Sequence, residues 1–546
     1  MTDTMAISII DTARYGWLSY LGIGCVIFFA YFIASAIYNL YFSPLARYPG
    51  PFLAKISAWP NFYYATTGYR HIWIWQCHEI YGEAFRFKPD GVLFNSPTAY
   101  RAIYQTKANT KKGKFYEIWS RNPQYINTLT KVDKIAHARK RRVLNSAFSE
   151  KAIRSAETFV VKHVDRWTEL IINENDGKGW TVPKNMSDLS DYLVFDIMGD
   201  LCFGTSFNLK EAEENQFKHM PHTIADYMRF MYPITQSPIL ALWVWLKPRG
   251  LDGVLEIASP KNVKDYYKFV DESVAKRRRE EENLEKSGAD ESQGRKDMFH
   301  YLFKATDDAG NPAYSVDELN SEANLLIIGG SDTTSTIMTG FWFYLTRHPR
   351  VYDKLVKEIR TTFKSADDIK TGPALITCKY LLACVDETLR LSPAGTSELA
   401  REVLPGGLDI AGHLIPEGTH VGVATWTIMH NQEFYGDPWV YRPERWLTDS
   451  VTGVTTEDVA RAQSCFNPFT IGQGNCVGQK FAMGELLITF AKTLHRMDVR
   501  LAPGDTLGAG AIELGWGMRS KDHITLKDAY ISIKDGPMLQ FRRRPI

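Results

Sequence analysis

An apolar run with no charged side chain lies near the N-terminus, from Trp17 to Tyr38. It is rich in Ile, Phe, Leu and Ala, and ~20 such residues suffice to cross a bilayer as a helix. The alternative is a cleaved signal peptide. However, the run is longer than a typical signal core, and no A-x-A-like cleavage site follows it. We therefore predict a membrane anchor within residues 1–42.

The charges on the two sides of this apolar run differ. Two acids and an arginine precede it, whereas Arg47, Lys55 and Arg70 follow it, with no acid until Glu79. The positive-inside bias therefore predicts that the rest of the chain lies in the cytosol. Directly after the run, Ser43–Pro51 contains three prolines and a glycine, which cannot continue a helix and are typical of a stiff hinge.

Strand and helix patterns follow the hinge. Residues Ala84–Phe94 alternate around a Pro-Asp-Gly turn, which predicts a β-hairpin, and Leu408–Trp426 indicates a second small sheet region. Ser315 and Glu318 form a capping box that opens a helix of about 30 residues, ~45 Å long, which stops before Pro349. A helix of this length must cross the whole domain. The patterns therefore predict a mainly α fold with small β-sheets.

The middle of this long helix carries an unusual polar segment. Gly329–Thr334 reads GGSDTT, which has poor helix propensity where an apolar core helix should be strongest. A broken local rule of this kind indicates a functional site. The alternative is a helix kink without a function.

Two other helix-period segments carry charged side chains one turn apart. His137 and Arg141 share a helical face, so two donor or cationic groups point together. Glu387 and Arg390 are also one turn apart and can meet a third group, Arg445. The alternatives are a solvated basic face for the first pair and solvated salt bridges, worth well under ~1 kcal/mol, for the second.

The cysteine loop, Phe469–Gly478, places a thiol where a tight turn enters a helix. Cys476 lies among Gly472, Gly474 and Gly478, and an apolar-periodic run follows it. Glycines permit positive φ and close approach to a flat ligand, and the start of a helix favours a thiolate. The pattern indicates an anionic metal ligand. The alternative is a buried structural cysteine beside a glycine turn.

Composition narrows the choice of partners and compartment. The chain has 546 residues, 64 of them basic and 62 acidic, so its charge gives no reason to expect a nucleic-acid partner. Its seven cysteines show no paired or CxxC spacing, which fits a reducing compartment and predicts no structural disulfides. Length alone would suggest two or more domains.

The cysteine loop resembles the haem-binding loop of the cytochrome P450 superfamily, in which a Phe, two Gly and a Cys recur at this spacing before a helix. The His137–Arg141 pair, the GGSDTT segment and the Glu387–Arg390–Arg445 set resemble three further motifs of that family, in the same order. This resemblance covers essentially the whole chain after the anchor. It implies the cytochrome P450 fold with a single N-terminal transmembrane helix: an N-terminal segment and anchor in residues 1–42, and one haem-thiolate monooxygenase domain in residues 43–546.

The resemblance also implies how a haem would be held. Cys476 would be the axial ligand of the iron of haem b. The other residues that would bind the cofactor are Phe469, Gly472, Gly478, His137, Arg141 and Arg401. Of these, His137 stands where the family has Trp, and Arg401 lies near a usual propionate ligand. The chain departs from the family at Gly474, where Arg or His is usual.

Catalytic and structural roles follow from the same resemblance. Gly329 and Gly330 would leave room above the iron, and the acid Asp332 and the alcohol Thr333 would deliver protons during oxygen activation. The residues Glu387, Arg390 and Arg445 would form a buried structural triad that fixes the segment leading to the cysteine loop.

These expectations describe a membrane-anchored haem-thiolate monooxygenase that oxidises an apolar small molecule with O2. The chain has no nucleotide-binding fingerprint or flavin domain, so NADPH electrons would come through a separate NADPH-cytochrome P450 reductase, with cytochrome b5 as a further candidate partner. The protein would be a single-pass protein of the endoplasmic reticulum membrane with a cytosolic catalytic domain. The cysteine loop and the PERW segment look most like fungal members of secondary metabolism.

Two alternative functions of other classes stay open. A haem-thiolate isomerase or dehydratase would need no reductase, although such members usually lose the acid and alcohol that this chain keeps at Asp332 and Thr333. A haem-free, membrane-tethered binding scaffold would bind no carbon monoxide. The substrate itself has no sequence code, because pocket residues lie on loops.

Three segments would border the substrate pocket by analogy with the family: Phe115–Val132, Gly395–Leu399 and Leu514–Ser520. A fourth segment, Ile239–Leu246, is too short to span a membrane and too apolar to be freely solvated, so it must be covered. It would either cap the substrate channel and dip into the bilayer, or be a buried core segment.

Overall fold

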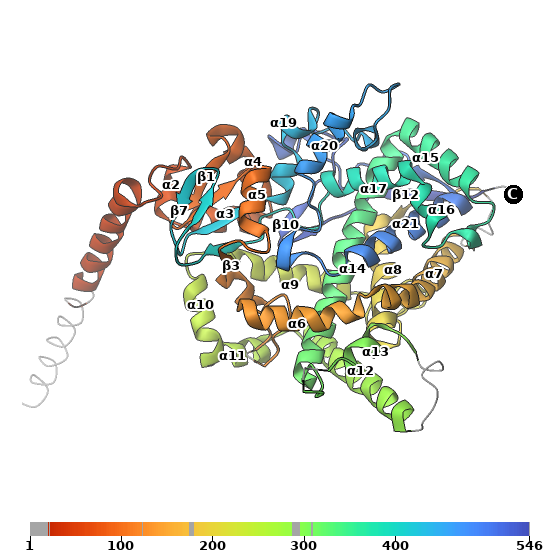
Figure 1. Ribbon diagram of the computed structural model, residues 1–546, viewed down its shortest axis with the longest axis horizontal. Helices are drawn as coiled ribbons and strands as arrows, with labels where there is room; N and C mark the ends of the chain where they lie inside the picture. Colours follow the sequence, from red (N-terminus) through yellow and green to blue (C-terminus); the bar gives the residue numbers. More distant parts are fainter. Residues whose placement is uncertain are drawn as a thin grey trace, which may run out of the picture.

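The computed structural model describes residues 20, 22–122, 124–173, 179–286, 295–306 and 309–544. Helices make up most of the body, and the largest sheet lies at the end nearest the projecting N-terminal helix (Figure 1). The predicted fold class, mainly helical with small sheets, is confirmed.

The α-helices range in length from four residues in α19 to 32 residues in α14. In chain order they are α2 (Phe52–Ile56), α3 (Trp59–Thr67), α4 (Arg70–Tyr81), α5 (Pro97–Tyr104), α6 (Lys134–Ala147), α7 (Glu150–Asn173), α8 (Met186–Phe203), α9 (Met220–Thr235), α10 (Leu240–Leu246), α11 (Leu251–Ala258), α12 (Lys261–Lys286), α13 (Met298–Phe303), α14 (Val316–Arg347), α15 (Pro349–Thr362), α16 (Pro373–Thr377), α17 (Lys379–Leu391), α18 (Thr425–Met429), α19 (Gln432–Tyr435), α20 (Thr456–Ser464) and α21 (Gln479–Arg496).

The strands form four small sheets in the described residues. Their bounds are β1 (Ala84–Lys88), β2 (Gly91–Phe94), β3 (Thr110–Lys112), β4 (Lys184–Asn185), β5 (Arg401–Val403), β6 (Leu408–Ile410), β7 (His413–Ile415), β8 (His420–Val423), β9 (Met497–Leu501), β10 (Lys527–Ala529), β11 (Ile531–Ile533) and β12 (Met538–Arg543). The largest sheet has the order β1-β2-β8-β5-β3, and the others are β4-β12-β9, β6-β7 and β10-β11. The predicted hairpin is the antiparallel pair β1–β2, and the second predicted sheet region supplies β6, β7 and β8.

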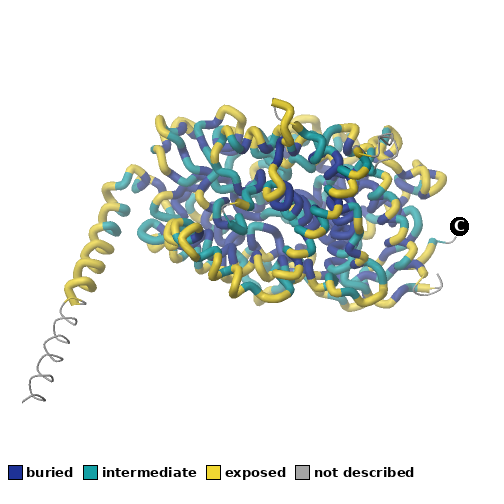
Figure 2. Tube along the Cα trace, turned by 90° about the horizontal axis from the view of Figure 1, so that it is seen from below, coloured by how far each residue is buried: buried dark blue, intermediate teal, exposed yellow. Residues whose placement is uncertain are grey.

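The N-terminal helix stands away from the body (Figures 1 and 2). Its apolar stretch Gly22–Phe42 has the length and hydropathy of a membrane span, with none of its hydrophobic window buried against the protein. The last turn, Tyr38–Phe42, is a π-helix, and Ser43 ends it in an extended conformation. Residues 17–19 and 21 of the predicted anchor lie outside the described part of the chain.

The long helix α14 runs through the body and organises its core (Figure 1). It opens with the predicted capping box, in which Ser315 and Glu318 bond each other's backbone N–H groups, and it ends at Arg347. Its closest partner is α8, and its C-terminal half stacks Phe341 against Phe490 of α21 at 3.6 Å between ring centroids. Because both ends of α14 are held in this way, the polar segment Gly329–Thr334 in its middle has a fixed position inside the protein.

The apolar segment Ile239–Leu246 forms α10, and no residue of that helix is buried. Leu242 and Trp245 each expose 54% of their surface. The alternative of a buried core segment is therefore wrong. The helix lies on the side of the body that also carries the N-terminal helix (Figure 1), next to α11.

Candidate active site

A cavity of about 470 Å³ brings together segments that are far apart in the sequence. Its lining comes from the cysteine loop, α6, α9, α12, β5 and the middle of α14. The predicted site residues that line it are Cys476, Phe469, Gly478, His137, Arg141, Arg401 and Thr333, whereas Gly472 and Asp332 do not reach its surface.

The cysteine loop is closed by its own backbone. The N–H of Cys476 donates to the carbonyl of Phe469 at 2.8 Å, and Gly478 is the N-cap of α21. Gly472 has φ +71°, and a Cβ atom there would overlap the backbone of Tyr104, so this position requires glycine. The predicted tight turn into a helix is present, and its sulfur faces the cavity.

The Cys476 side chain is exposed only in the sense that it opens into the cavity. Protein atoms surround it closely, and burial raises the pKa of its thiol, while the N–H groups of Gly478 and Gln479 and the charge of Arg141 act in the opposite direction. The other six cysteines line no part of this cavity, and all seven are free. Cys476 is thus the thiol positioned to meet a ligand in the cavity.

Arg141 fixes the loop as well as facing the cavity. Its guanidinium donates to the carbonyl and, at 2.8 Å, to the side-chain oxygen of Asn475, the residue before Cys476. His137, one turn earlier on α6, is buried, and desolvation followed by the charges of Lys112, Arg141 and Arg401 lowers its pKa to about 4. At neutral pH it is therefore a neutral hydrogen-bond donor rather than a cation.

Lys112 is a site residue that the sequence pattern did not reveal. It lies at the end of β3, and its Nζ donates to the carbonyls of Thr128 at 2.9 Å and Leu129 at 2.8 Å. Burial, together with the nearby charge of Arg401, lowers its pKa to about 7. In the sequence it is one of three lysines near a glycine, which is equally typical of a solvated surface turn.

Arg401 lies where a side chain at position 474 would lie. Its Nη1 donates to the hydroxyl of Tyr116 at 3.2 Å, and its guanidinium packs over the ring of Tyr104. An ideal Cβ atom on Gly474 would be 2.9 Å from Nη2 of Arg401. Gly474 is not among the glycines with positive φ. The departure at Gly474 therefore leaves room for the arginine from β5.

The charges around the cavity are unbalanced. Its described lining includes Lys112, His137, Arg141 and Arg401 but no aspartate or glutamate. His137 is neutral at pH 7, but a buried cation such as Arg401 is costly without a counter-charge. Burial, followed by the charges of neighbouring basic groups, lowers the pKa of both Lys112 and His137. The cavity is therefore built for a ligand with negative charge at this end.

The polar segment of α14 divides between two sides of the helix. Thr333 lines the cavity and donates to the carbonyl of Gly329 at 2.6 Å. Gly329 is open to the cavity, but a Cβ atom on Gly330 would meet Met198 of α8 at 2.7 Å. Gly330 thus also serves close helix packing. Asp332 points away from the cavity toward Lys534, and burial raises its pKa to about 6.

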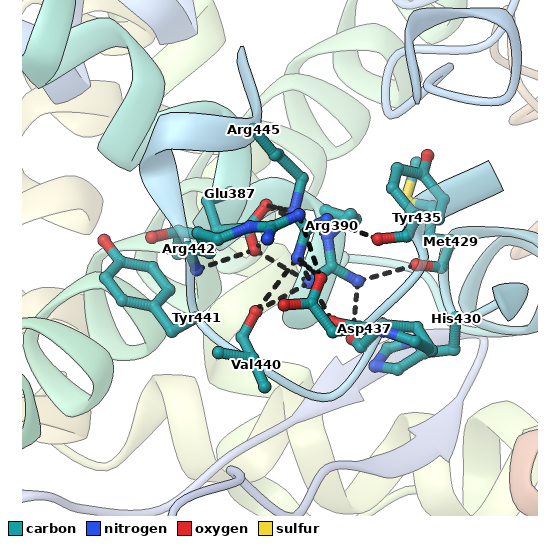
Figure 3. Close-up of polar contacts among 12 residues, drawn as sticks. Glu387, Arg390, Met429, His430, Tyr435, Asp437, Val440, Tyr441, Arg442 and Arg445 are labelled. Carbon is teal, nitrogen blue, oxygen red and sulfur yellow. Dashed lines mark hydrogen bonds and ion pairs between the residues drawn. The ribbon is translucent and has the colours of Figure 1, made fainter. Parts of the chain in front are cut away.

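The Glu387–Arg390–Arg445 set forms a buried ion-pair network (Figure 3). Arg390 donates to both carboxylate oxygens of Glu387 at 3.0 and 2.8 Å, and Nε of Arg445 lies 3.0 Å from each of them. Although burial acts to raise it, the two arginines hold the pKa of Glu387 below its usual value. The network does not reach the cavity, so its contribution is to structure.

Two of the three segments predicted to border the pocket do so. Tyr116, Trp119 and residues 127–130 line the cavity, as do Gly395 and Leu399. Residues 514–520 do not line it, and that expectation is wrong. The lining from the C-terminal part comes instead from Tyr530 and Ile531, where β10 and β11 form a hairpin beside α14.

Comparison with known proteins gives a consistent family assignment. A cytochrome P450 family model matches residues 49–517. The chain is 34% identical to the cytochrome P450 monooxygenase fscF of Fusarium equiseti, over 95% of this chain and 96% of the relative. It is 36% identical to apf7 of Gibberella fujikuroi, over 96% and 99%, and 33% identical to AKT7 of Alternaria alternata, over 94% and 95%. Both are also cytochrome P450 monooxygenases.

Proposed function

The chain belongs to the cytochrome P450 family and is a monooxygenase of that family; we propose that it oxidises an apolar small molecule with O2 at the endoplasmic reticulum membrane. Residues 1–42 would form the N-terminal segment and anchor, and residues 43–546 the haem-thiolate monooxygenase domain. The exposed apolar helix Gly22–Phe42 supports the anchor. The exposed side chains of α10 on the same side of the body support a second contact with the bilayer.

The donors around the cavity fit haem b. The two propionates of haem carry negative charge, and Lys112, His137, Arg141 and Arg401 face the cavity with no acid among them. A haem bound by the Cys476 thiolate would supply the redox chemistry that activates oxygen. The protein would hold the sulfur in place through the N–H groups of Gly478 and Gln479 and through Arg141, which bonds the adjacent Asn475.

Asp332 and Thr333 would carry protons toward the cavity. The Thr333 hydroxyl lies at the cavity surface, where it can hold a proton donor in place, while its neighbour Asp332 lies behind it in the core. A carboxyl with a pKa of about 6 gains and loses protons readily near neutral pH. A retained acid and alcohol support monooxygenation, in which activation of dioxygen consumes protons, over isomerisation or dehydration, which do not activate dioxygen.

Electrons would come from NADPH through a separate NADPH-cytochrome P450 reductase, with cytochrome b5 as a second electron donor. The family model spans residues 49–517, and most of the chain is therefore occupied by the P450 domain itself. A cytosolic position of this domain, with a single-pass anchor, would let a reductase on the same membrane reach it.

The substrate would be an apolar small molecule. The cavity lining includes aromatic and aliphatic side chains of α9, α12 and α14, with a few polar groups such as Thr223 and Asn324. The relatives come from filamentous fungi, which supports a role in fungal secondary-metabolite biosynthesis.

The observation that carries this proposal is a thiol, Cys476, facing four donors and no acid across one cavity. We expect the reduced protein with carbon monoxide to show the red-shifted Soret band of a thiolate-ligated haem. Cys476→Ser should abolish this band, and Cys465→Ser should keep it, because Cys465 is buried outside the cavity. The reverse result would refute the ligand assignment, and no band in the unaltered protein would favour a haem-free scaffold.

A further inference from the structure

A buried lysine connects Asp332 to a second carboxylate. Lys534 follows β11, and its Nζ lies 2.7 Å from Oδ1 of Asp191 on α8 and 3.6 Å from Oδ1 of Asp332 on α14. The three side chains expose 4, 9 and 10% of their surface, respectively. One cation therefore serves two buried acids, and it lies closer to Asp191 than to Asp332.

The backbone around Lys534 is fixed from both sides. The carbonyl of Ser532 accepts from the Thr336 hydroxyl of α14 at 3.1 Å, and the carbonyl of Lys534 lies within hydrogen-bond reach of the Ser187 hydroxyl of α8. The lysine thus reaches Asp332 from a strand that is tied to both helices. Its position is built into the packing of α8, α14 and β11.

Asp332 is not fully paired by this contact. Its Oδ2 atom is buried and has no hydrogen-bond partner among the described residues, and its Oδ1 has the longer of the two lysine contacts. Lys534 favours the ionised form of Asp332, whereas burial and the charge of Asp191 oppose it. About one turn before Asp191 on α8, Asp188 pairs with the exposed His222 at 3.2 Å.

We propose that Lys534, anchored by Asp191, is a positioning residue that holds Asp332 in place and ready to exchange protons behind Thr333. The role in proton exchange rests on the proposed monooxygenase function, whereas the pairing of Lys534 with Asp332 does not. A tighter contact would lock Asp332 as a permanent carboxylate, and no contact would leave two buried acids in competition. The intermediate geometry leaves Asp332 free to take up a proton and release it within each turnover.

The test uses two substitutions with opposite expected signs. Lys534→Met removes the cation and should raise the pKa of Asp332 by about 1 unit or more, roughly tenfold in proton affinity. Asp191→Asn removes the competing acid and frees the lysine for Asp332, so the pKa should fall. Lys534→Arg should stay near the original value. An exposed lysine, replaced in Lys268→Met, serves as the matched control.

The titration is read in the purified holoprotein by infrared difference spectroscopy of the carboxylic-acid C=O stretch, assigned through Asp332→Asn. Opposite shifts in Lys534→Met and Asp191→Asn would support the pairing, and loss of fold alone cannot produce them. Shifts of the Asp332 pKa in the same direction in both variants, or no shift in either, would overturn the pairing. If Lys534→Met does not fold, an unchanged Asp332 pKa in Asp191→Asn would by itself overturn it.

The proton-delivery role has its own readout, product formed per NADPH as a function of pH with added reductase. The pH dependence should move with the infrared titration in each variant. If the Asp332 titration shifts in a variant but the pH dependence of product per NADPH does not, the proton-delivery role is overturned, while the Lys534–Asp332 pairing stands. If no variant and not even the unaltered protein forms product, the proposed function fails, while the titration still decides whether Lys534 pairs with Asp332.

Discussion

Two buried charge clusters lie on neighbouring helices, and they are built in opposite ways. In the triad around Glu387, both carboxylate oxygens accept hydrogen bonds from Arg390 and Arg445, and also from the N–H of Arg442 and the indole of Trp446. In the cluster around Asp332, one oxygen has a 3.6 Å lysine contact and the other has no partner among the described residues.

The pKa directions express the same difference. The arginines hold the pKa of Glu387 below its usual value despite full burial, whereas burial raises the pKa of Asp332 to about 6. A saturated carboxylate keeps its charge and fixes structure, and an under-saturated one can change protonation during a reaction. The comparison therefore separates a structural from a functional use of buried acids within one fold.

The largest effect should come from breaking the saturated cluster. Glu387→Gln leaves the buried Arg390 without a counter-charge and leaves Arg445 with Asp437 alone. Loss of one partner of such a buried pair costs about 3–5 kcal/mol. We expect this loss in the free energy of unfolding from denaturant titration. Glu272→Gln, which removes an exposed i,i+4 partner of Lys268, should change it little. Similar losses in the two variants would show that the triad is not saturated in solution.

The next effect concerns the functional cluster and leaves stability nearly unchanged. Thr333→Ala removes the hydroxyl at the cavity surface, so NADPH oxidation should divert to peroxide. The amount of product formed per NADPH should fall, by up to about 10²-fold, which is the contribution of a positioned acid–base group. Haem content and substrate-binding spectra should stay near those of the unaltered protein. Unchanged coupling would remove Thr333 from the mechanism and favour the isomerase or dehydratase class.

A smaller effect should appear at the donors around the cavity. Gly474→Arg places a side chain against the guanidinium of Arg401, so we expect it to lower haem occupancy after gel filtration. Combining it with Arg401→Gly should restore occupancy, because the second change opens that space and the first returns a cation. If the two losses simply add, Arg401 does not stand in for the side chain missing at position 474.

The smallest effect should follow removal of residues 1–42. The apolar helix Gly22–Phe42 has none of its hydrophobic window buried, so the body should fold and take up haem without it. Haem occupancy of the truncated protein should match that of the full chain in detergent. Residual binding to vesicles is expected through Leu242 and Trp245 of α10, which are exposed. If the truncated protein did not take up haem, residues 1–42 would be a part of the folded catalytic domain.

The main features of the fold were predictable where local patterns are strong. The capping box at Ser315 and the turn between β1 and β2 depend on neighbouring residues, and both are present. The Glu387 triad was anticipated from helical spacing together with a family resemblance, since spacing alone also fits exposed ion pairs. Neighbouring residues thus predict individual helices and turns, whereas the order of several motifs along the chain was needed to predict which side chains meet in the triad.

Other parts of the site depend on long-range packing and have no local signal. Lys112 reaches the cavity because β3 pairs with β5, and Lys534 reaches Asp332 because β11 packs on α14. Both are ordinary lysines in the sequence. The space that a side chain at Gly474 would occupy is likewise filled by Arg401, which lies 73 residues earlier in the chain. Such contacts appear only once the sheets are in place.

The most direct measurement compares the unfolding free energy of Asp332→Asn with that of Glu387→Gln at several pH values. Each variant exchanges a buried carboxyl for an amide of the same shape. Because the folded pKa of Asp332 is raised, its stabilising contribution is complete at low pH and is lost as pH rises through about 6. Asp332→Asn should therefore be neutral or stabilising at pH 7.5.

The sign is opposite for Glu387, whose folded pKa is lowered. Its contribution is present above the unfolded pKa and is lost as pH falls through the folded value, so Glu387→Gln should be strongly destabilising at pH 7.5. The predicted result is opposite pH slopes and a large gap between the two variants at neutral pH. Equal destabilisation by both substitutions would contradict the distinction between a saturated structural acid and an under-saturated functional one.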